Sequence, residues 1–249
     1  MTTTVQLVTD SRGRNILPKL IHHTNDDLDI EWNSQVLPGA NLETISKWIE
    51  RTQRRRTWDI TIIIAGICNF TRKVQSRNKR YLEYTTRKAD EIKSTIDLLL
   101  NQHGITTHLC TITPAVLSKF SNHRDGDTDI VEEQTNLLSD IEDVNEHIKL
   151  RNIERDTATY DLAVQSYTKS LKRQGQQRKK IIKFSGKDLP DGVHPSISLE
   201  DTWAKYLVKV TASIINRNNT TENTTEDSDQ EQSDSDQDQS GNFKRAKRN

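Results

Sequence analysis

The chain has 249 residues, of which 32% are hydrophobic, a low fraction for a globular protein. Its 36 basic and 36 acidic residues cancel, so composition alone does not single out a nucleic-acid-binding protein. No apolar run approaches the roughly 18–20 residues of a membrane span, so we expect none.

Short apolar runs predict four strands in the first half of the chain. In chain order they are VQLV (5–8), the alternating LDIEWNSQV (28–36), WDITIIIAGI (58–67) and THLCTIT (107–113). The third run does not alternate, so we expect it near the centre of a sheet that is covered on both faces.

Apolar residues at spacings of three, four and seven predict four helices, because those spacings place side chains on one helix face. The stripes are Leu42, Ile45 and Ile49; Leu82, Ala89, Ile92, Ile96 and Leu99; Ile130, Leu137, Ile141, Val144 and Ile148; and Leu199, Trp203, Leu207, Val210 and Ile214. Strands and helices alternate along the chain. This order predicts an α/β fold with a mostly parallel sheet and helices on both faces.

Two segments lack a strong pattern. Residues 151–184 contain weak helical stripes and end in the apolar KIIKF (180–184), which is either a fifth strand or an extended connection. The stretch NNTTENTTEDSDQEQSDSDQDQS has no aliphatic or aromatic residue and cannot bury enough apolar surface to fold. We therefore predict one folded domain over residues 1–217 and a disordered acidic tail over residues 218–249 that ends in a basic cluster.

The tail also divides the charge. It holds eight acids and four bases, which leaves 28 acids and 32 bases in residues 1–217. The first residues lack the basic start and long apolar stretch of a secretory signal, and Cys68 and Cys110 both lie in apolar runs. We expect an intracellular protein with reduced thiols, in the cytoplasm or, because of the terminal KRAKR, in the nucleus.

Sites in open parallel sheets form beyond the carboxyl ends of the strands. That rule nominates the loop after Val8, the loop LPGAN and the loop AGICNFT. A further loop, DLPDGVHPS, places Asp191 three residues before His194, so that on one turn the carboxylate can orient the imidazole. A serine nucleophile such as Ser11 needs a base of this kind to remove its proton.

Taken together, these loops resemble four short blocks of the SGNH (GDSL-like) hydrolase family, over most of residues 4–216. VTDSRGRN stands at the family's nucleophile block, and LPGAN at its oxyanion glycine. AGICNFT stands at its glycine, any residue, asparagine block, and DGVHPS resembles its aspartate, two residues, histidine block. The blocks also resemble SGNH-type domains encoded near invertebrate mobile elements.

This resemblance implies a fold, an activity and a set of site residues. The fold would be a three-layer α/β/α sandwich around a five-stranded parallel sheet. The activity would be that of a serine esterase or acyl hydrolase acting on small-molecule, lipid or carbohydrate esters, without a metal or organic cofactor. Ser11 would be the nucleophile, His194 the general base and Asp191 its orienting partner, with the N–H groups of Ser11 and Gly39 as oxyanion donors.

The sequence departs from the family at two positions. Cys68 stands where the family has the asparagine that donates to the oxyanion, and a thiol is a weak donor. Asn69 follows one place late and could replace it only if the loop is rearranged. Thr9 stands where the family commonly has glycine, which narrows the space beside Ser11.

Each of these residues also has a structural explanation. A lone serine is commonly a turn or cap residue, and Asp191 in PDG and Gly39 after Pro38 both suit turns. Cys68 is more often a small buried hydrophobe than a reactive thiol. The cysteines lack the paired spacing of a zinc site, so we expect no metal.

The second hypothesis is an SGNH-like fold that has lost efficient catalysis and binds nucleic acid or protein. The basic run RTQRRR (51–56) suits the dipole at a helix C-terminus. The basic run KRQGQQRKK (172–180) lacks interleaved aromatic residues for base stacking. Neither run by itself indicates nucleic acid, and the sequence indicates neither the substrate nor an oligomeric state.

Overall fold

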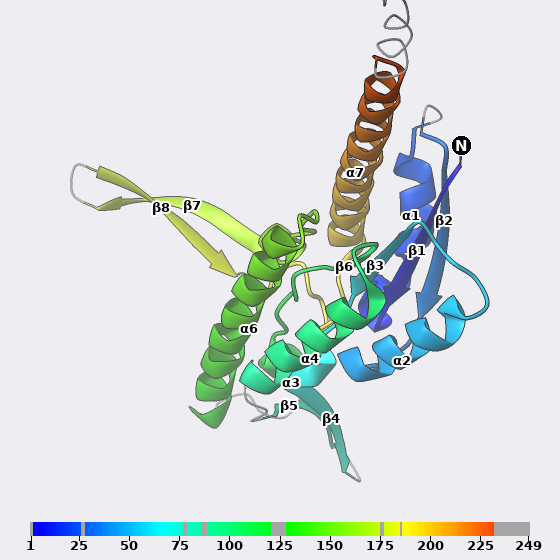
Figure 1. Ribbon diagram of the computed structural model, residues 1–249. Coiled ribbons are helices and arrows are strands. Elements are labelled where there is room, and N and C mark those ends of the chain that lie inside the picture. Colours follow the sequence, from blue (N-terminus) through cyan, green and yellow to red (C-terminus); the bar gives the residue numbers. More distant parts are fainter. Residues whose placement is uncertain are drawn as a thin grey trace, which may run out of the picture. The chain divides into compact units, whose positions relative to one another are not determined.

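The computed structural model describes a chain of two units (Figure 1). The described residues are 2–25, 28–76, 79–85, 89–120, 128–174, 177–184 and 186–231. The first unit covers Met1–Val210 and the second covers Thr211–Asn249, and each is described by itself.

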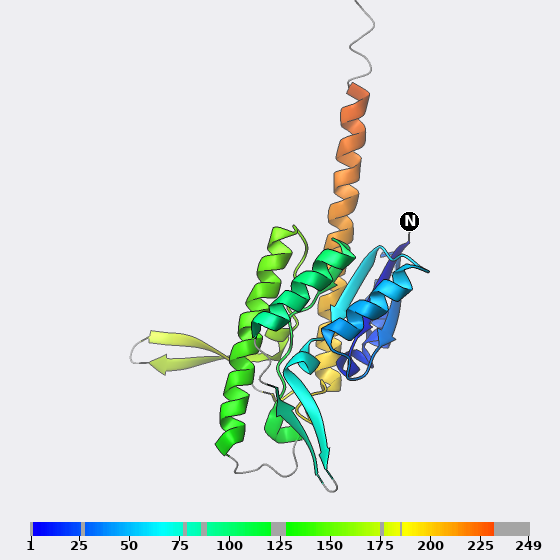
Figure 2. The same cartoon turned by 60° about the horizontal axis from the view of Figure 1, so that its bottom comes forward.

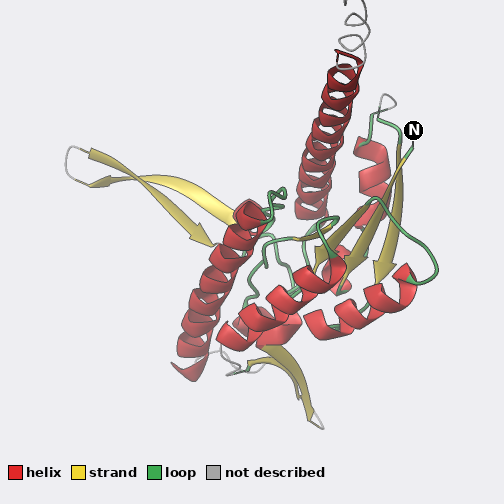
Figure 3. Cartoon of the chain, viewed as in Figure 1, coloured by secondary structure: helices red, strands yellow, loops and turns green. Residues whose placement is uncertain are grey.

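A parallel sheet forms the centre of the first unit, as the predicted α/β class requires (Figure 3). Its strands, in spatial order, are β2 (Ile30–Val36), β1 (Thr3–Thr9), β3 (Ile60–Ile64) and β6 (Thr107–Leu109). Val5 of β1 lies opposite Trp32 on one side and Ile60 on the other. In the described residues the sheet has four strands, one fewer than the predicted number of about five.

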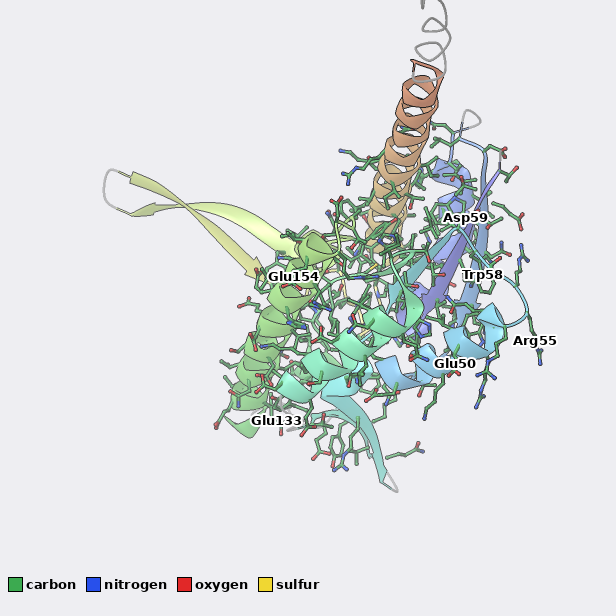
Figure 4. The ribbon with its side chains drawn as sticks, in the orientation of Figure 1. Glu50, Arg55, Trp58, Asp59, Glu133 and Glu154 are labelled. Atoms are coloured by element: carbon green, nitrogen blue, oxygen red, sulfur yellow. The ribbon has the colours of Figure 1, made fainter. Side chains whose placement is uncertain are left out.

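Helices and short helical turns lie between and after the strands along the chain. They are η1 (Ser11–Gly13), α1 (Ile16–His23), α2 (Leu42–Gln53), α3 (Ile67–Phe70), α4 (Ala89–His103), α5 (Leu117–Phe120), α6 (Thr128–Glu154), η2 (Ala163–Ser166) and α7 (Ile197–Glu231). In Figure 4 the label Glu154 marks the last residue of α6, and the label Glu133 lies near its beginning. One core joins α2, α4 and α6 to side chains of the sheet, including Val8, Ile63 and Leu109.

Side-chain contacts join two further helices, α1 and α7. Lys19 of α1 contacts Glu200 of α7 at 2.7 Å, and His23 contacts Asp201 at 2.6 Å. None of the described helices is long and apolar enough to cross a membrane.

Two antiparallel hairpins lie where the sequence predicts other elements: the start of a helix at Leu82, and a fifth strand or a connection at KIIKF. β4 (Thr71–Ser76) pairs with β5 (Lys79–Tyr84), so Leu82 lies in a strand and the predicted helical stripe begins only at Ala89. β7 (Tyr167–Gln174) pairs with β8 (Gln177–Phe184), so KIIKF belongs to a separate ribbon rather than to the central sheet.

The fourth predicted strand is shorter than its apolar run. β6 ends at Leu109, and beyond it the amide of Thr111 donates to the carbonyl of Tyr160 at 3.0 Å. The side chain of Asn145 bonds both backbone groups of Ile112, at 2.6 and 2.9 Å. These partners replace a neighbouring strand, which is why an apolar segment leaves the sheet without exposing its backbone.

The last helix is longer than its apolar stripe. α7 continues to Glu231, whereas the tail was predicted to be disordered from residue 218. Extending an existing helix costs little, because each added residue gains a hydrogen bond. Residues 232–249, which include the terminal basic cluster, lie outside the described residues.

Candidate active site

Ser11 lies at the carboxyl end of the central strand β1. The amide of Asp10 still bonds to the carbonyl of Ile64 on β3, at 3.1 Å. The carboxylate of Asp10 then accepts from the amide of Arg12 at 2.8 Å, which caps the short turn η1. Ser11 is the first residue of that turn, so its own amide begins a helical turn and has no acceptor within it.

Thr9 and Gly13 fit together behind this turn. A Cβ atom at Gly13 would lie 2.3 Å from Oγ1 and 2.7 Å from Cγ2 of Thr9. The side chain of Thr9 therefore fills the space that a side chain at position 13 would need. The departure from glycine at position 9 is matched by a glycine four residues later.

The loop before α7 carries Asp191 and His194. Oδ1 of Asp191 accepts from the amides of Val193 at 2.9 Å and His194 at 2.8 Å. Gly192 between them has φ +82°, and a Cβ there would lie 2.3 Å from the carbonyl oxygen of Val116. Only glycine suits this conformation and this close approach.

These two loops bring three predicted residues together. Nε2 of His194 lies 3.0 Å from Oγ of Ser11, and Nδ1 of the same ring lies 2.5 Å from Oδ2 of Asp191. The side chains of His194 and Asp191 are 37% and 48% exposed, so the pair opens to solvent. Oγ, imidazole and carboxylate therefore form a continuous chain of hydrogen bonds at the sheet's carboxyl edge.

Partial burial by itself would raise the pKa of Asp191, but hydrogen bonds from the ring and amide of His194 and the amide of Val193 outweigh it and lower the pKa. The carboxylate is therefore ionised near neutrality and can only accept. A neutral His194 then carries its proton on Nδ1. Its Nε2 is left free to accept the hydroxyl proton of Ser11.

Two buried charges next to Ser11 were missed from the sequence. Arg12 is 3% exposed and donates to the carbonyl of Thr113, and to that of Pro114 at 3.4 Å. Burial raises the pKa of Asp10 and lowers the pKa of Arg12, while their mutual attraction opposes both shifts. An arginine in DSRGR looks like a surface residue in the sequence, and no pattern there indicates that it anchors the turn η1 to the segment after β6.

Gly39 occupies the turn predicted for it. The amide of Ala40 bonds to the carbonyl of Leu37 at 3.1 Å, and Gly39 has φ +73°, as the third residue of a type II turn requires. A Cβ at this position would meet nothing within 4 Å. The space beside the glycine is therefore open, and its freedom serves the backbone conformation rather than close packing.

Asn69 has a different environment from the one expected of an oxyanion donor. It is 2% exposed, its Oδ1 accepts from the amide of Leu42 at 2.9 Å, and its Nδ2 donates to Glu43 at 3.0 Å. These bonds attach α3 to the start of α2. The geometry favours a structural role for Asn69, which holds the end of the Gly39 loop in place.

Cys68 lies close enough to Asp10 and Arg12, beside Ser11, for their charges to affect the pKa of its thiol. Burial, followed by the nearby carboxylate of Asp10, raises the pKa of its thiol to about 11, against the opposing effect of Arg12. The thiol is therefore protonated at neutral pH and can donate only a weak hydrogen bond. Among the described residues, no group of three or more His, Cys, Asp or Glu side chains could hold a metal ion.

Comparison with known proteins finds similar structures but no similar sequence. No family model matches the chain, and no curated protein matches it. The structure is similar to a lipase/acylhydrolase from Enterococcus faecalis, at a TM-score of 0.55 and 11% identity over 84% of this chain and 94% of that one. The chain has the fold of the GDSL-type hydrolases.

Other solved structures agree with this assignment of the fold. A putative lipolytic protein of the G-D-S-L family from Desulfitobacterium hafniense matches at a TM-score of 0.54 and 13% identity, over 84% of this chain and 99% of that one. A putative acylhydrolase from Bacteroides fragilis matches at 0.56 and 11% identity, over 87% and 88% of the two chains. At these identities the GDSL-type likeness concerns the fold alone.

Proposed function

We propose that the protein is an SGNH-type serine esterase or acyl hydrolase that uses Ser11, His194 and Asp191. The observation that carries the proposal is the hydrogen-bond chain from Oγ of Ser11 through both ring nitrogens of His194 to the carboxylate of Asp191. A serine hydroxyl becomes a nucleophile when an adjacent base is itself held in the right tautomer.

In the first half of the reaction, Oγ of Ser11 attacks the carbonyl carbon of an ester while Nε2 of His194 takes the hydroxyl proton. The carbonyl π electrons move to oxygen and form a tetrahedral intermediate. As it collapses, the imidazolium of His194 returns the proton to the leaving alcohol. An acyl-serine remains, and the ionised Asp191 stabilises the transient charge on the ring.

In the second half, Nε2 of His194 takes a proton from water, whose oxygen attacks the acyl carbon. Collapse of this second intermediate breaks the bond to Oγ, the proton passes to Ser11, and a carboxylic acid leaves. The amides of Ser11 and Gly39 are the proposed donors to both oxyanions. The third position belongs to the thiol of Cys68, a weaker donor than an amide.

The exposure of the site and the names of solved structures with a similar fold support a class of substrate. The half-exposed His194 and Asp191 suit esters that reach an open site. The solved structures of similar fold include proteins named as a lipase/acylhydrolase and as an esterase inhibited by monoethylphosphonate, the latter from Pseudoalteromonas at a TM-score of 0.50 and 8% identity. We therefore place small-molecule, lipid or carbohydrate esters first.

A fluorophosphonate probe tests the proposal, because it forms a covalent bond only with an activated serine. We expect the wild type to be labelled and Ser11→Ala to remain unlabelled. A matched control is Ser46→Ala, since Ser46 also contacts a histidine, Nε2 of His103, at 2.9 Å. Nδ1 of His103 contacts the amide oxygen of Gln53 at 3.3 Å, whereas Nδ1 of His194 contacts a carboxylate, so this control should label like the wild type. Absence of labelling in the wild type, or equal labelling of Ser11→Ala, rules the proposal out.

The environment of Cys68 and Asn69 favours a second candidate, an SGNH-like binding module with weak or no catalysis. Losing one good oxyanion donor lowers the rate roughly 10²–10³-fold. The two candidates differ in one measurement. An esterase turns over p-nitrophenyl acetate with Ser11-dependent kinetics, whereas a binding module shows no difference between the wild type and Ser11→Ala.

A further inference from the structure

Lys73 lies on the β4–β5 hairpin, which extends from the first unit (Figures 1 and 2). Its cross-strand neighbour is Leu82, which is 3% exposed and belongs to the core. Residues directly opposite each other in an antiparallel pair lie on the same face of the hairpin. Lys73 therefore lies on the face that packs toward the core, although the residue itself is exposed.

Phe120, the last residue of α5, meets Lys73 on this face. The ammonium of Lys73 lies 5.7 Å from the centroid of the Phe120 ring, within the range of a cation–π interaction. The ring packs against the core that includes Leu82, and α5 packs against β5. These contacts place the ammonium of Lys73 beside α5.

The helix α5 in turn packs on the loop 191–194, which carries the proposed base and its carboxylate. The amide of Val116, just before α5, donates to the carbonyl of Gly192 at 2.7 Å. A Cβ atom at Gly192 would lie 3.2 Å from the amide nitrogen of Phe120. The backbone of Phe120 therefore lies against this loop, while its ring contacts Lys73.

The charge of Lys73 also acts on the other half of the site. Burial raises the pKa of Asp10, next to Ser11, and Lys73 opposes this shift more weakly than Arg12 does. Burial, followed by Asp10, raises the pKa of the Cys68 thiol to about 11, and Arg12 and Lys73 both oppose that shift. Because the interaction of two charges falls with distance and with solvent screening, the ammonium lies near the turn η1 as well as near the loop 191–194.

No carboxylate of the described residues forms an ion pair with Lys73. Its neighbour Arg72 differs, because Nε of Arg72 contacts Glu83 at 2.7 Å on the opposite face of the hairpin. A lysine ammonium has three donors, and an aromatic ring covers only one side of it. Lys73 therefore keeps donors and a positive charge available at the edge of the site.

We propose that Lys73 binds an anionic group of the substrate, a carboxylate or a phosphate, while Ser11 attacks the ester carbonyl; this rests on the esterase function proposed above. A lysine is a compact point charge, so it accepts either anion without a fixed geometry. Because Lys73 lies near both η1 and the loop 191–194, one small molecule can place an anion on it and a carbonyl at Ser11. The preferred substrates are therefore esters that carry a negative charge.

A different role for Lys73 would be direct stabilisation of the oxyanion, where the thiol of Cys68 is a weak donor. That role accelerates every ester, since every ester forms the same kind of oxyanion. Binding of a substrate anion favours only charged esters. A comparison of charged and neutral esters therefore separates the two roles.

The test compares pairs of esters that differ in one charge. Mono-p-nitrophenyl glutarate and its methyl ester differ on the acyl side, and p-acetoxybenzoate and its methyl ester differ on the alcohol side. For each pair, kcat/KM of the charged ester is divided by kcat/KM of the neutral one. In Lys73→Gln we expect this ratio to fall roughly three- to fivefold in at least one pair, mainly through KM. Lys73→Arg should keep the ratio, and Lys73→Glu should lower it further.

The matched control is Arg72→Gln, which removes the neighbouring base on the opposite face of β4. We expect its ratios to equal those of the wild type in both pairs. Salt screens exposed charges, so the wild-type ratio should fall as the ionic strength rises, and the ratio of Lys73→Gln should change less. An equal fall for charged and neutral esters, or the same change in Arg72→Gln, overturns the proposal.

A further substrate distinguishes the two anions. The ester p-acetoxyphenyl phosphate carries a phosphate where p-acetoxybenzoate carries a carboxylate. A lower KM for the phosphate, lost in Lys73→Gln, identifies a phosphate as the natural group. A lower KM for the carboxylate, lost in the same variant, identifies a carboxylate.

Binding to Ser11→Ala separates this proposal from the esterase function. NMR titrations compare monomethyl with dimethyl glutarate, and p-acetoxybenzoate with its methyl ester. Tighter binding of a charged ligand that Lys73→Gln removes supports the proposal even if the wild type hydrolyses no ester. Binding and hydrolysis without any preference for the charged member overturn it, and Ser11-dependent hydrolysis then leaves the esterase function standing. Absence of both binding and hydrolysis for every charged ester also overturns it.

Discussion

The carboxylate of Asp191 holds His194 at two points. Oδ2 contacts the ring Nδ1 at 2.5 Å, and Oδ1 accepts from the backbone amide of the same residue at 2.8 Å. One side chain therefore fixes the imidazole and the turn of chain that carries it. The carboxylate sets the tautomer of the ring and its distance from Ser11 together.

We predict that Asp191→Asn lowers kcat by roughly 10³–10⁴, because an amide can donate to Nδ1 and so leave the proton on the wrong nitrogen. Steady-state hydrolysis of p-nitrophenyl acetate measures the effect. The control is Asp201→Asn, which alters a similar aspartate–histidine contact, 2.6 Å from Nε2 of His23. Equal rates for Asp191→Asn and the wild type would contradict the proposed role of the carboxylate.

We predict that Gly13→Ala lowers stability by about 1–3 kcal/mol and reduces fluorophosphonate labelling, because its methyl group would overlap Thr9. Thermal unfolding and labelling rates measure the two effects. The double variant Thr9→Gly with Gly13→Ala should regain labelling, since it moves the small residue to the position that the family commonly uses. A double variant that labels no better than Gly13→Ala alone would show that the two positions are not coupled.

We predict that Cys68→Asn raises kcat by up to about 10²-fold, because an amide donates to an oxyanion better than a thiol. Cys68→Ser should give a smaller gain and Cys68→Ala none. The order of the kcat values of the three variants tests the prediction. If Cys68→Asn and Cys68→Ala are equally slow, position 68 does not face the oxyanion.

We predict that Cys68 reacts slowly with iodoacetamide at pH 8, about 10²-fold below a free cysteine, because its pKa of about 11 leaves little thiolate. The rate should rise about tenfold per pH unit up to pH 10, since each unit raises the thiolate fraction tenfold. Mass spectrometry of the alkylated peptide assigns the site. Cys110→Ala should give the same profile, and a fast, pH-independent reaction would show that the thiol is not desolvated.

The sequence predicts the central sheet and its long helices better than the two antiparallel hairpins. Buried strands show in the sequence as short apolar runs and helices as apolar stripes, and β1, β3, α6 and the first turns of α7 lie where these patterns place them. The pattern predicts the wrong element at Leu82. Its spacing to Ala89 suits a helix, but Leu82 lies in the strand β5, where its side chain is buried. Leu82 is the first apolar residue of its predicted stripe, so no earlier apolar residue shows whether it belongs to a helix or to a strand.

Contacts in the site could be predicted where both residues are close in sequence. They were harder to predict where the residues come from distant segments. Asp191 and His194 are close in sequence, and their mutual contact follows from one turn. The role of Asn69 was not visible, because its partners Leu42 and Glu43 belong to another helix. Arg12 was missed for the same reason, since only the fold brings Thr113 and Pro114 against it.

The contact between Ser11 and His194 spans 183 positions of sequence. A growing chain thus makes Ser11 183 residues before it makes His194. A nascent, nicked or C-terminally shortened chain that lacks the last loop would carry an ordinary, unreactive serine. Labelling of Ser11 would therefore report in one signal that the first unit has been made and closed.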